Sequence, residues 1–172
     1  MEFALFAPLF FLIVLGAGDL GRVFYYNVAI TNIAREGARH GAYFNPATGG
    51  NSYANATDIM TAVRNEASFL GTGYGNLTEQ SAPGTSGTCP GPDTTHHMPP
   101  YTASLWPTTD NTGYVYICFG DTDSHSTVAF GDHLRVTVLY TFTPMTPVLW
   151  NFLGNNGQVH VTGTAEFLVE GL

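Results

Sequence analysis

The chain has 172 residues, of which 44% are hydrophobic and only 10% are charged, compared with about 25% in an ordinary globular domain. Residues 1–43 carry three acids and three arginines, whereas residues 44–172 carry ten acids and two arginines, so the net charge of −8 lies entirely in the later part. This acidity argues against a nucleic-acid partner and against docking on anionic lipid, because both require a basic surface.

The first feature along the chain is an uncharged apolar run at residues 3–18, which lies between Glu2 and Asp19. Its sixteen residues fall slightly short of the roughly 20 that a membrane-spanning helix needs. The apolar character resumes as far as Tyr26 if Asp19 pairs with Arg22, which is three positions later on the same helix face. The segment is therefore predicted to be a membrane-type helix.

The helical pattern continues to residue 43, because small residues recur there at helical spacing. One row contains Ile30, Ala34 and Ala38, and a second contains Ile33, Gly37 and Gly41. Small residues four apart allow a helix to approach a partner closely. We therefore expect one helix over residues 3–43, about 60 Å long, with Pro8 and the glycines at 16, 18 and 21 as candidate positions for a bend.

A helix of this length cannot be buried by the remainder of the chain. Residues 44–172 form a domain whose radius of gyration would be about 14 Å. The second half of the helix can pack on this head, whereas the first half has to enter a bilayer or contact other copies. The sequence thus predicts two parts, a polymerisation or membrane helix (1–43) and a globular head (44–172).

The head is expected to begin with a short helix over residues 57–70, capped by Asn55 or Thr57. Residues 71–112 are rich in Gly, Pro, Thr and Ser and are predicted to form an ordered but irregular excursion. Cys89 and Cys118 suit a single disulfide in an exported protein, which would stabilise the fold by roughly 3–4 kcal/mol in the entropic model. Two unrelated buried thiols are the alternative.

Three strands follow, at residues 114–119, 133–143 and 158–169, where the hydrophobic period changes to two. In the middle strand Leu134, Val136, Val138, Tyr140 and Phe142 share one side, and Arg135, Thr137 and Thr141 share the other. An antiparallel sheet with one apolar face needs a cover. The second half of the long helix, with its rows of small residues, is the natural one.

Motifs that would indicate catalysis are missing from the sequence. It contains no GxSxG elbow, no HExxH, no P-loop and no GxGxxG before a helix. We therefore expect neither an enzyme nor a bound cofactor.

Asp121 and Asp123 are weak candidates for a calcium site, since they are spaced as in calcium loops, but the Gly and the distal Glu of an EF-hand are missing. A plain acidic turn is the alternative, so we expect no metal. Asn55 and Asn76 each begin an N-glycosylation sequon, a pattern that also arises by chance.

Several features of the first 39 residues together resemble the TadE-like pseudopilins of the tight-adherence branch of type IV pili. They are the opening EFAL at residues 2–5, Pro8 within the apolar run, the acid-x-Gly-Arg step from Asp19 to Arg22, and NIAREGAR at residues 32–39. The rest of the chain resembles the family only loosely, for example in the segment VTVLYTFTPMTP at residues 136–147 and in an acid near the C-terminus.

The resemblance implies an α+β, pilin-like fold, in which a long protruding helix packs by its C-terminal half against a small antiparallel sheet. It also implies export, removal of a short basic leader by a prepilin peptidase, and a helix that serves first in the membrane and then in a filament. The family pattern places an acid at the fifth mature position, whereas Glu2 is the second residue here. Its carboxylate either neutralises the N-terminal amine of a neighbouring subunit or lies at the bilayer surface.

The leading hypothesis is a structural subunit of an extracellular pilus-like filament, which reaches the cell surface through the cytoplasmic membrane. Its partners would be other copies of the chain and the secretion and assembly machinery. The residues expected in the assembly helix are Glu2, Phe3, Leu5, Pro8, Phe10, Phe11, Leu12, Val14, Leu15, Asp19, Arg22 and Phe24. The alternatives are a minor pseudopilin that stays in the membrane or primes a tight-adherence pilus, and a membrane-anchored binding module or enzyme whose loop 71–132 holds a ligand.

Overall fold

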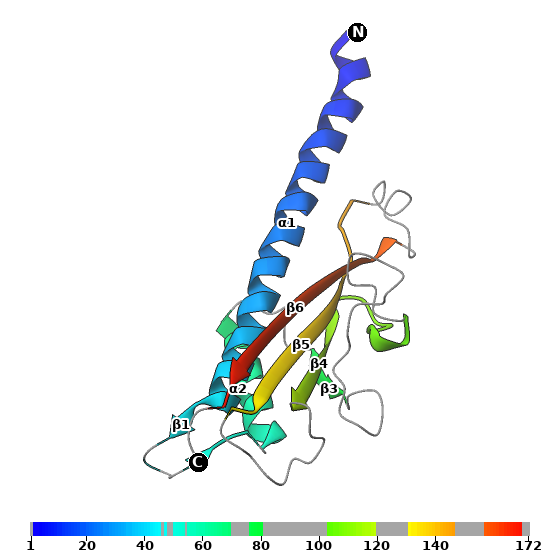
Figure 1. Cartoon of the computed structure of the whole chain (residues 1–172). Helices are drawn as coiled ribbons and strands as arrows, with labels where there is room; N and C mark the ends of the chain where they lie inside the picture. The colour runs from blue at the N-terminus through cyan, green and yellow to red at the C-terminus, as the bar shows by residue number, and fades with distance from the viewer. Residues whose placement is uncertain are drawn as a thin grey trace.

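The computed structural model describes residues 2–45, 47, 50–53, 55–69, 76–80, 103–119, 131–146 and 157–169. A single long helix, α1 (Glu2–Ala42), runs along one face of a twisted sheet and projects well beyond it, with the N-terminus at the free end (Figure 1). The expected α+β, pilin-like arrangement is confirmed.

Helix α1 continues without a break through Pro8 and the three glycines at 16, 18 and 21. Nothing lies within 4 Å of where a side chain on any of these glycines would begin. At the other end, Arg39 and His40 lie in the last turn, where basic residues interact favourably with the helix dipole. The amide of Tyr43 donates to the carbonyl of Arg39 at 3.0 Å and closes the helix.

Two short strands, β1 (Phe44–Asn45) and β2 (Gly50–Asn51), pair antiparallel beyond the end of α1. They lead into a second helix, α2 (Ala56–Phe69), where the sequence predicted a helix over 57–70. Asn55 caps this helix, since its side-chain Oδ1 accepts a hydrogen bond from the amide of Asp58 at 3.2 Å. The buried face of α2, formed by Ile59, Val63 and Ala67, packs in the core with α1.

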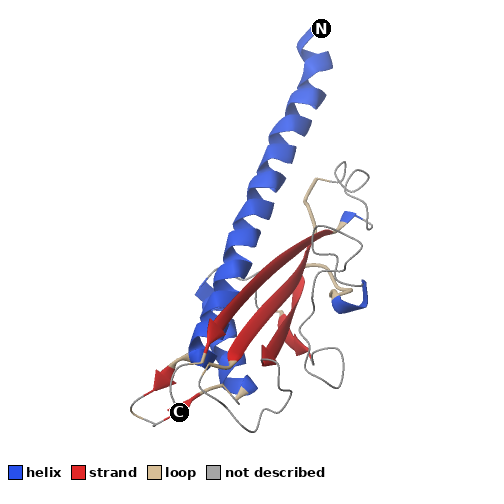
Figure 2. Ribbon diagram, in the orientation of Figure 1, coloured by secondary structure: helices blue, strands red, loops and turns tan. Residues whose placement is uncertain are grey.

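The main sheet contains β3 (Leu77–Gln80), β4 (Thr112–Phe119), β5 (His133–Phe142) and β6 (Val159–Leu168), in that order (Figure 2). Strands β4, β5 and β6 pair antiparallel, as expected. Strand β3 was not expected, because the sequence predicted an irregular excursion there. It pairs parallel with β4, so the sheet is mixed rather than wholly antiparallel.

The core lies between α1 and the sheet. The apolar side of β5 that the alternation predicted is completely buried, and it faces buried residues of α1. The backbone of β6 approaches the backbone of the helix where the two cross: a Cβ placed on Gly163 would lie 2.6 Å from the carbonyl oxygen of Ile30. Only glycine fits this crossing without a shift of the backbone.

The predicted rows of small residues on α1 face the head, as their spacing suggested. A Cβ on Gly37 would lie 2.5 Å from Cγ2 of Val63 on α2, and one on Gly41 would overlap Leu134 on β5. Ala34 and Ala38 are fully buried beside them. The small side chains therefore allow α1 to lie close to both α2 and the sheet.

The second face of the sheet is also covered, which the alternation alone did not indicate. A 3₁₀ turn, η1 (Ala103–Leu105), leads to Trp106, which stacks on His160 of β6 with ring centroids 4.0 Å apart. The hydroxyl of Thr141 donates to the carbonyl of Pro107 at 3.1 Å. Part of the predicted irregular excursion thus packs on this face of the sheet and covers it.

Candidate functional site

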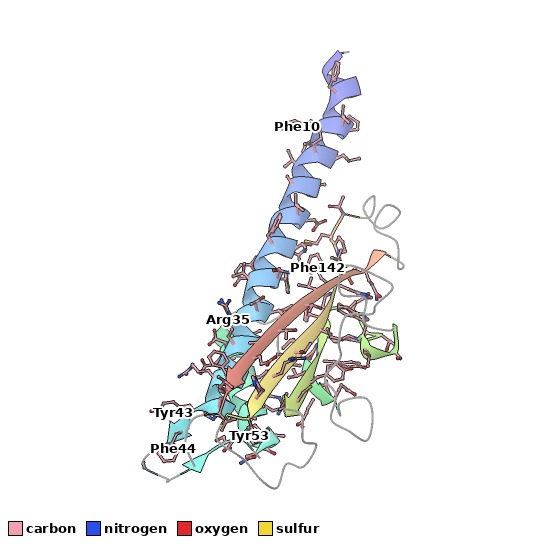
Figure 3. The ribbon with its side chains drawn as sticks, in the orientation of Figure 1. Phe10, Arg35, Tyr43, Phe44, Tyr53 and Phe142 are labelled. Carbon is pink, nitrogen blue, oxygen red and sulfur yellow. The ribbon has the colours of Figure 1, made fainter. Side chains whose placement is uncertain are left out.

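Residues 2–18 of α1 project beyond the head (Figure 1), and we call them the free half. From Phe6 on, this half presents apolar side chains on all sides. The predicted assembly residues in this half are 40–62% exposed, namely Phe10, Phe11, Leu12, Val14 and Leu15. Phe10 projects from the helix far from the sheet (Figure 3). No described part of the head covers this surface, so it is available to a lipid or to another protein.

The most N-terminal residues of the predicted assembly helix are placed by their backbone alone. Glu2, Phe3 and Leu5 lie in the first turns of α1, but their side chains are outside the described part of the chain. The partner of the Glu2 carboxylate therefore stays a prediction. Pro8 is exposed and does not interrupt the helix.

Helix α1 is long and apolar enough, by length and composition, to cross a membrane. The stretch that qualifies is Phe6–Ala42, and only 6% of its most apolar window is buried within the protein. The core helix of a soluble domain would have this window mostly buried. The exposure therefore favours a helix whose apolar surface contacts a bilayer or other subunits.

Asp19 marks the point where α1 meets the head. Its side chain is 4% exposed, and its Oδ2 accepts a hydrogen bond from the amide of Thr146 at 2.8 Å. Its Oδ1 accepts bonds from the amide of Met145 at 3.1 Å and from Nη1 of Arg22 at 3.3 Å. The expected Asp19–Arg22 pair is present, and the same carboxylate also attaches the segment after β5 to the helix. A buried carboxylate requires such donors.

An aromatic cluster follows one turn later on the same side of α1. The guanidinium of Arg22 lies 4.9 Å from the ring centroid of Phe142, which is a cation–π distance. Tyr26 contacts the same ring at 4.9 Å and stacks on Tyr140 at 5.3 Å. Phe142 ends β5 beside α1 (Figure 3), so these contacts fix the helix to the end of the sheet nearest its free half.

The opposite side of α1 stays apolar and exposed even where the helix runs along the head. Leu20, Phe24 and Val28, spaced four residues apart, form one row and are 58%, 65% and 60% exposed. We call this row the outer stripe. No described part of the head covers it, so α1 has an apolar surface for a further partner beyond its free half.

The first 39 residues match the family model described as TadE-like protein. The N-terminal segment is TadE-like. The match includes the free half, the Asp19–Arg22 step and most of the part that packs on the head. It suggests a protein associated with tight-adherence pili and, together with the apolar helix, association with a membrane. Neither the curated proteins nor the solved structures gave a match to the chain.

The cysteines and sequons lie away from the TadE-like helix. Cys118 is buried in β4, whereas Cys89 is outside the described residues, so their disulfide stays a prediction. Asn55 and Asn76 are both exposed, and Asn55 uses its Oδ1 to cap α2. Whether either carries a sugar stays a prediction as well.

The candidate calcium residues Asp121 and Asp123 are outside the described residues. Within the described ranges, no three His, Cys, Asp or Glu side chains are grouped so that they could hold a metal ion. A polar groove of about 760 Å³ lies at the C-terminal end of α1, where it is lined by α1, α2 and the β1–β2 hairpin. Its lining includes Glu36, His40, Asp58 and Glu66.

Sequence reasoning missed the head residues that hold the TadE-like helix. It found Asp19 and Arg22 but not the amides of Met145 and Thr146, which are 126 and 127 residues away. A buried acid predicts that donors exist without saying where. The loose family resemblance of residues 136–147 was the one signal in the sequence that pointed to this segment.

Proposed function

We propose that this protein is a structural subunit of an extracellular pilus-like filament and that it polymerises through α1. The observation that supports this most is the exposed apolar surface of the free half, which continues along the outer stripe beside the head. A surface of this length cannot stay in water, because each large apolar side chain left exposed forgoes roughly 1.5–3 kcal/mol of burial.

The filament and the membrane offer the same helix two apolar environments in succession. Before assembly, α1 would lie in the cytoplasmic membrane, and after assembly the helices of neighbouring copies would surround it. Because lipid chains are about as apolar as a bundle of Leu and Phe side chains, packing and polar contacts would favour the filament rather than the hydrophobic effect. The acidic, hydroxyl-rich heads would face outward.

Further parts of the proposal follow from the TadE-like match. A prepilin peptidase and the pilus assembly machinery would handle the chain, and the Glu2 carboxylate would meet the N-terminal amine of a neighbouring copy. The role is structural rather than catalytic. Asp19 keeps the partner that the sequence predicted, Arg22, and its carboxylate also bonds to the head of its own chain.

The TadE-like match itself favours a second candidate, a minor pseudopilin. Such a protein would stay in the membrane or prime a pilus built from another subunit. It would use the same exposed surface of α1, but against a different chain. The two candidates differ in stoichiometry, which only a measurement on the assembled filament supplies.

The decisive experiment is cryo-electron microscopy of filaments sheared from the cell surface, with this sequence built into the map. If this chain repeats along the filament, the first proposal holds and the contacts of Glu2 become visible. If the filaments consist of another chain and this one remains with the membrane or is rare, the minor-pseudopilin candidate replaces it.

A variant tests the surface itself. Phe24→Ser alters the centre of the outer stripe without touching the contacts between α1 and the head, so filament yield should fall while the protein still accumulates in the membrane. Leu168→Ser is the matched control, because Leu168 is 57% exposed but lies on β6. Equal filament yields from the two variants would argue against the outer stripe as an assembly surface.

A further inference from the structure

Residues 143–146, which we call the shoulder, combine an exposed apolar side chain with a fixed backbone. Met145 is 76% exposed, the highest value among the large hydrophobic side chains of the described residues. Its amide is nevertheless bonded to Asp19, as is that of Thr146. The shoulder therefore keeps the side chain of Met145 exposed to solvent while its backbone is held at a fixed position beside α1.

The shoulder lies at the end of the head that faces the free half of α1. In Figure 1 the segment after β5 rises beside the helix toward its free end. The shoulder therefore lies level with Asp19 along the helix, and the described strands of the sheet lie farther from the free end of α1 (Figure 1). A flat surface crossed by the helix would touch the protein there.

The length of the uncharged run shows where such a surface would lie. Residues 3–18 lie between two acids and, at 1.5 Å per residue, extend about 24 Å. The hydrocarbon core of a bilayer is about 30 Å thick. A span shorter than the bilayer brings its flanking residues to the membrane surface, so Asp19 and the shoulder attached to it would be drawn there.

We propose that the shoulder is a membrane-contact site, at which Met145 enters the interface of the lipid bilayer while α1 spans it. The shoulder carries no charge, and the sequence continues from Pro147 to Leu153 without a charged residue. Arg22, whose side chain is 37% exposed, can reach lipid phosphates from the same level, and Tyr25 is a residue type that membrane interfaces favour.

A lipid surface fits this site better than a second copy of the chain. A partner helix would follow the outer stripe, which is on the side of α1 away from the head, whereas the shoulder is on the head side. The partner is expected to be a zwitterionic rather than an anionic bilayer, because the net charge of the head is −8. Asp19 then acts as a positioning residue, because its bond to the amide of Met145 fixes where Met145 lies along α1 and therefore how deep it sits in the bilayer interface.

This site concerns the protein before assembly and does not depend on the filament proposal. The test places a photo-crosslinking benzoylphenylalanine at position 145 of the full-length protein in phosphatidylcholine nanodiscs. Irradiation should give a lipid adduct, identified by mass spectrometry. The control places the same residue at Thr61, which is exposed on α2 beside the polar groove at the far end of the head and should give no lipid adduct.

Two outcomes overturn the proposal: a crosslink from position 145 to a second copy of the chain, or equal lipid adducts at positions 145 and 61. The role of Asp19 is tested in the same assay. Asp19→Ala should lose the adduct, while Asp19→Asn, which keeps one acceptor oxygen, should recover part of it. Near-ultraviolet circular dichroism establishes that the head is folded in each variant, and an adduct unchanged by Asp19→Ala overturns the positioning role.

Discussion

Asp19 and Thr146 are 127 residues apart in the sequence, and a hydrogen bond of 2.8 Å joins the carboxylate of the first to the amide of the second. With the parallel bond to Met145, it attaches the segment after β5 to α1 at the point where the helix leaves the head. The same carboxylate pairs with Arg22, which lies over the ring of Phe142. One side chain thus connects the helix, the sheet end and the shoulder.

Replacing Asp19 by alanine should lower the free energy of unfolding of the head by about 3–6 kcal/mol, because hydrogen bonds to a charged group contribute about 1.5–3 kcal/mol each and two amides would lose their acceptor. Urea unfolding of the detergent-solubilised protein measures the loss. Glu36→Ala is the control, since it removes a more exposed ion pair with Arg39, worth less than about 1 kcal/mol. Equal losses in the two variants would contradict the attachment.

Much of the fold could be predicted because the patterns that encode it are local. The uncharged run and the rows of small residues on α1 predicted both the helix and the side that packs on the head. The alternation in β5 predicted the side that faces α1, from Leu134 to Phe142, but not that Thr137 and Thr141 on the other side are buried as well. In each case the physical cause acts within one element.

The features that escaped prediction depend on contacts between distant segments. Strand β3 has only four residues and pairs parallel with β4, so no alternation of useful length marks it. Trp106 covers the sheet by stacking on His160, 54 residues later, and neither residue is unusual where it stands. The donors to Asp19 are backbone amides, which every residue except proline carries, so the sequence could not single them out.

Replacing Gly163 by alanine should destabilise the contact between α1 and the sheet. The new Cβ would lie 2.6 Å from the carbonyl oxygen of Ile30. Because the backbone of β6 fixes the Cβ and the oxygen belongs to the backbone of α1, β6 would have to move away from the helix. A loss of about 1–3 kcal/mol in the free energy of unfolding is expected. Gly21→Ala is the matched control, since it meets open space and should stabilise the helix by up to about 1 kcal/mol. A Gly163→Ala variant as stable as the wild type would show that the backbones of β6 and α1 are farther apart at this crossing than the structure indicates.

Glu166 should make the head less stable in acid. A hydrogen bond from Arg135 holds the pKa of this carboxyl below its ordinary value of 4.5, and His133 adds to the effect. A lowered pKa stabilises the fold above pH 4.5, and this stabilisation is lost as the pH falls through the folded-state value. Because the side chain is 36% exposed, the effect should stay below about 1 kcal/mol. Glu166→Gln should flatten the dependence as the pH falls below 4.5, measured by urea unfolding.

His160 should control stability in a separate, higher range of pH. Its burial against Trp106 lowers the pKa of the imidazole below the ordinary value of 6.5. The unfolded chain therefore takes up a proton before the folded one does, so stability is complete above pH 6.5 and is lost as the pH falls through the folded-state value. His160→Phe keeps a ring for Trp106 to stack on and should remove this dependence as the pH falls below 6.5, measured by urea unfolding with tryptophan fluorescence. The control is His40→Phe, which alters an exposed residue of α1 and should leave the dependence unchanged. If His160→Phe kept the wild-type slope, another group would be responsible for the loss of stability in this range.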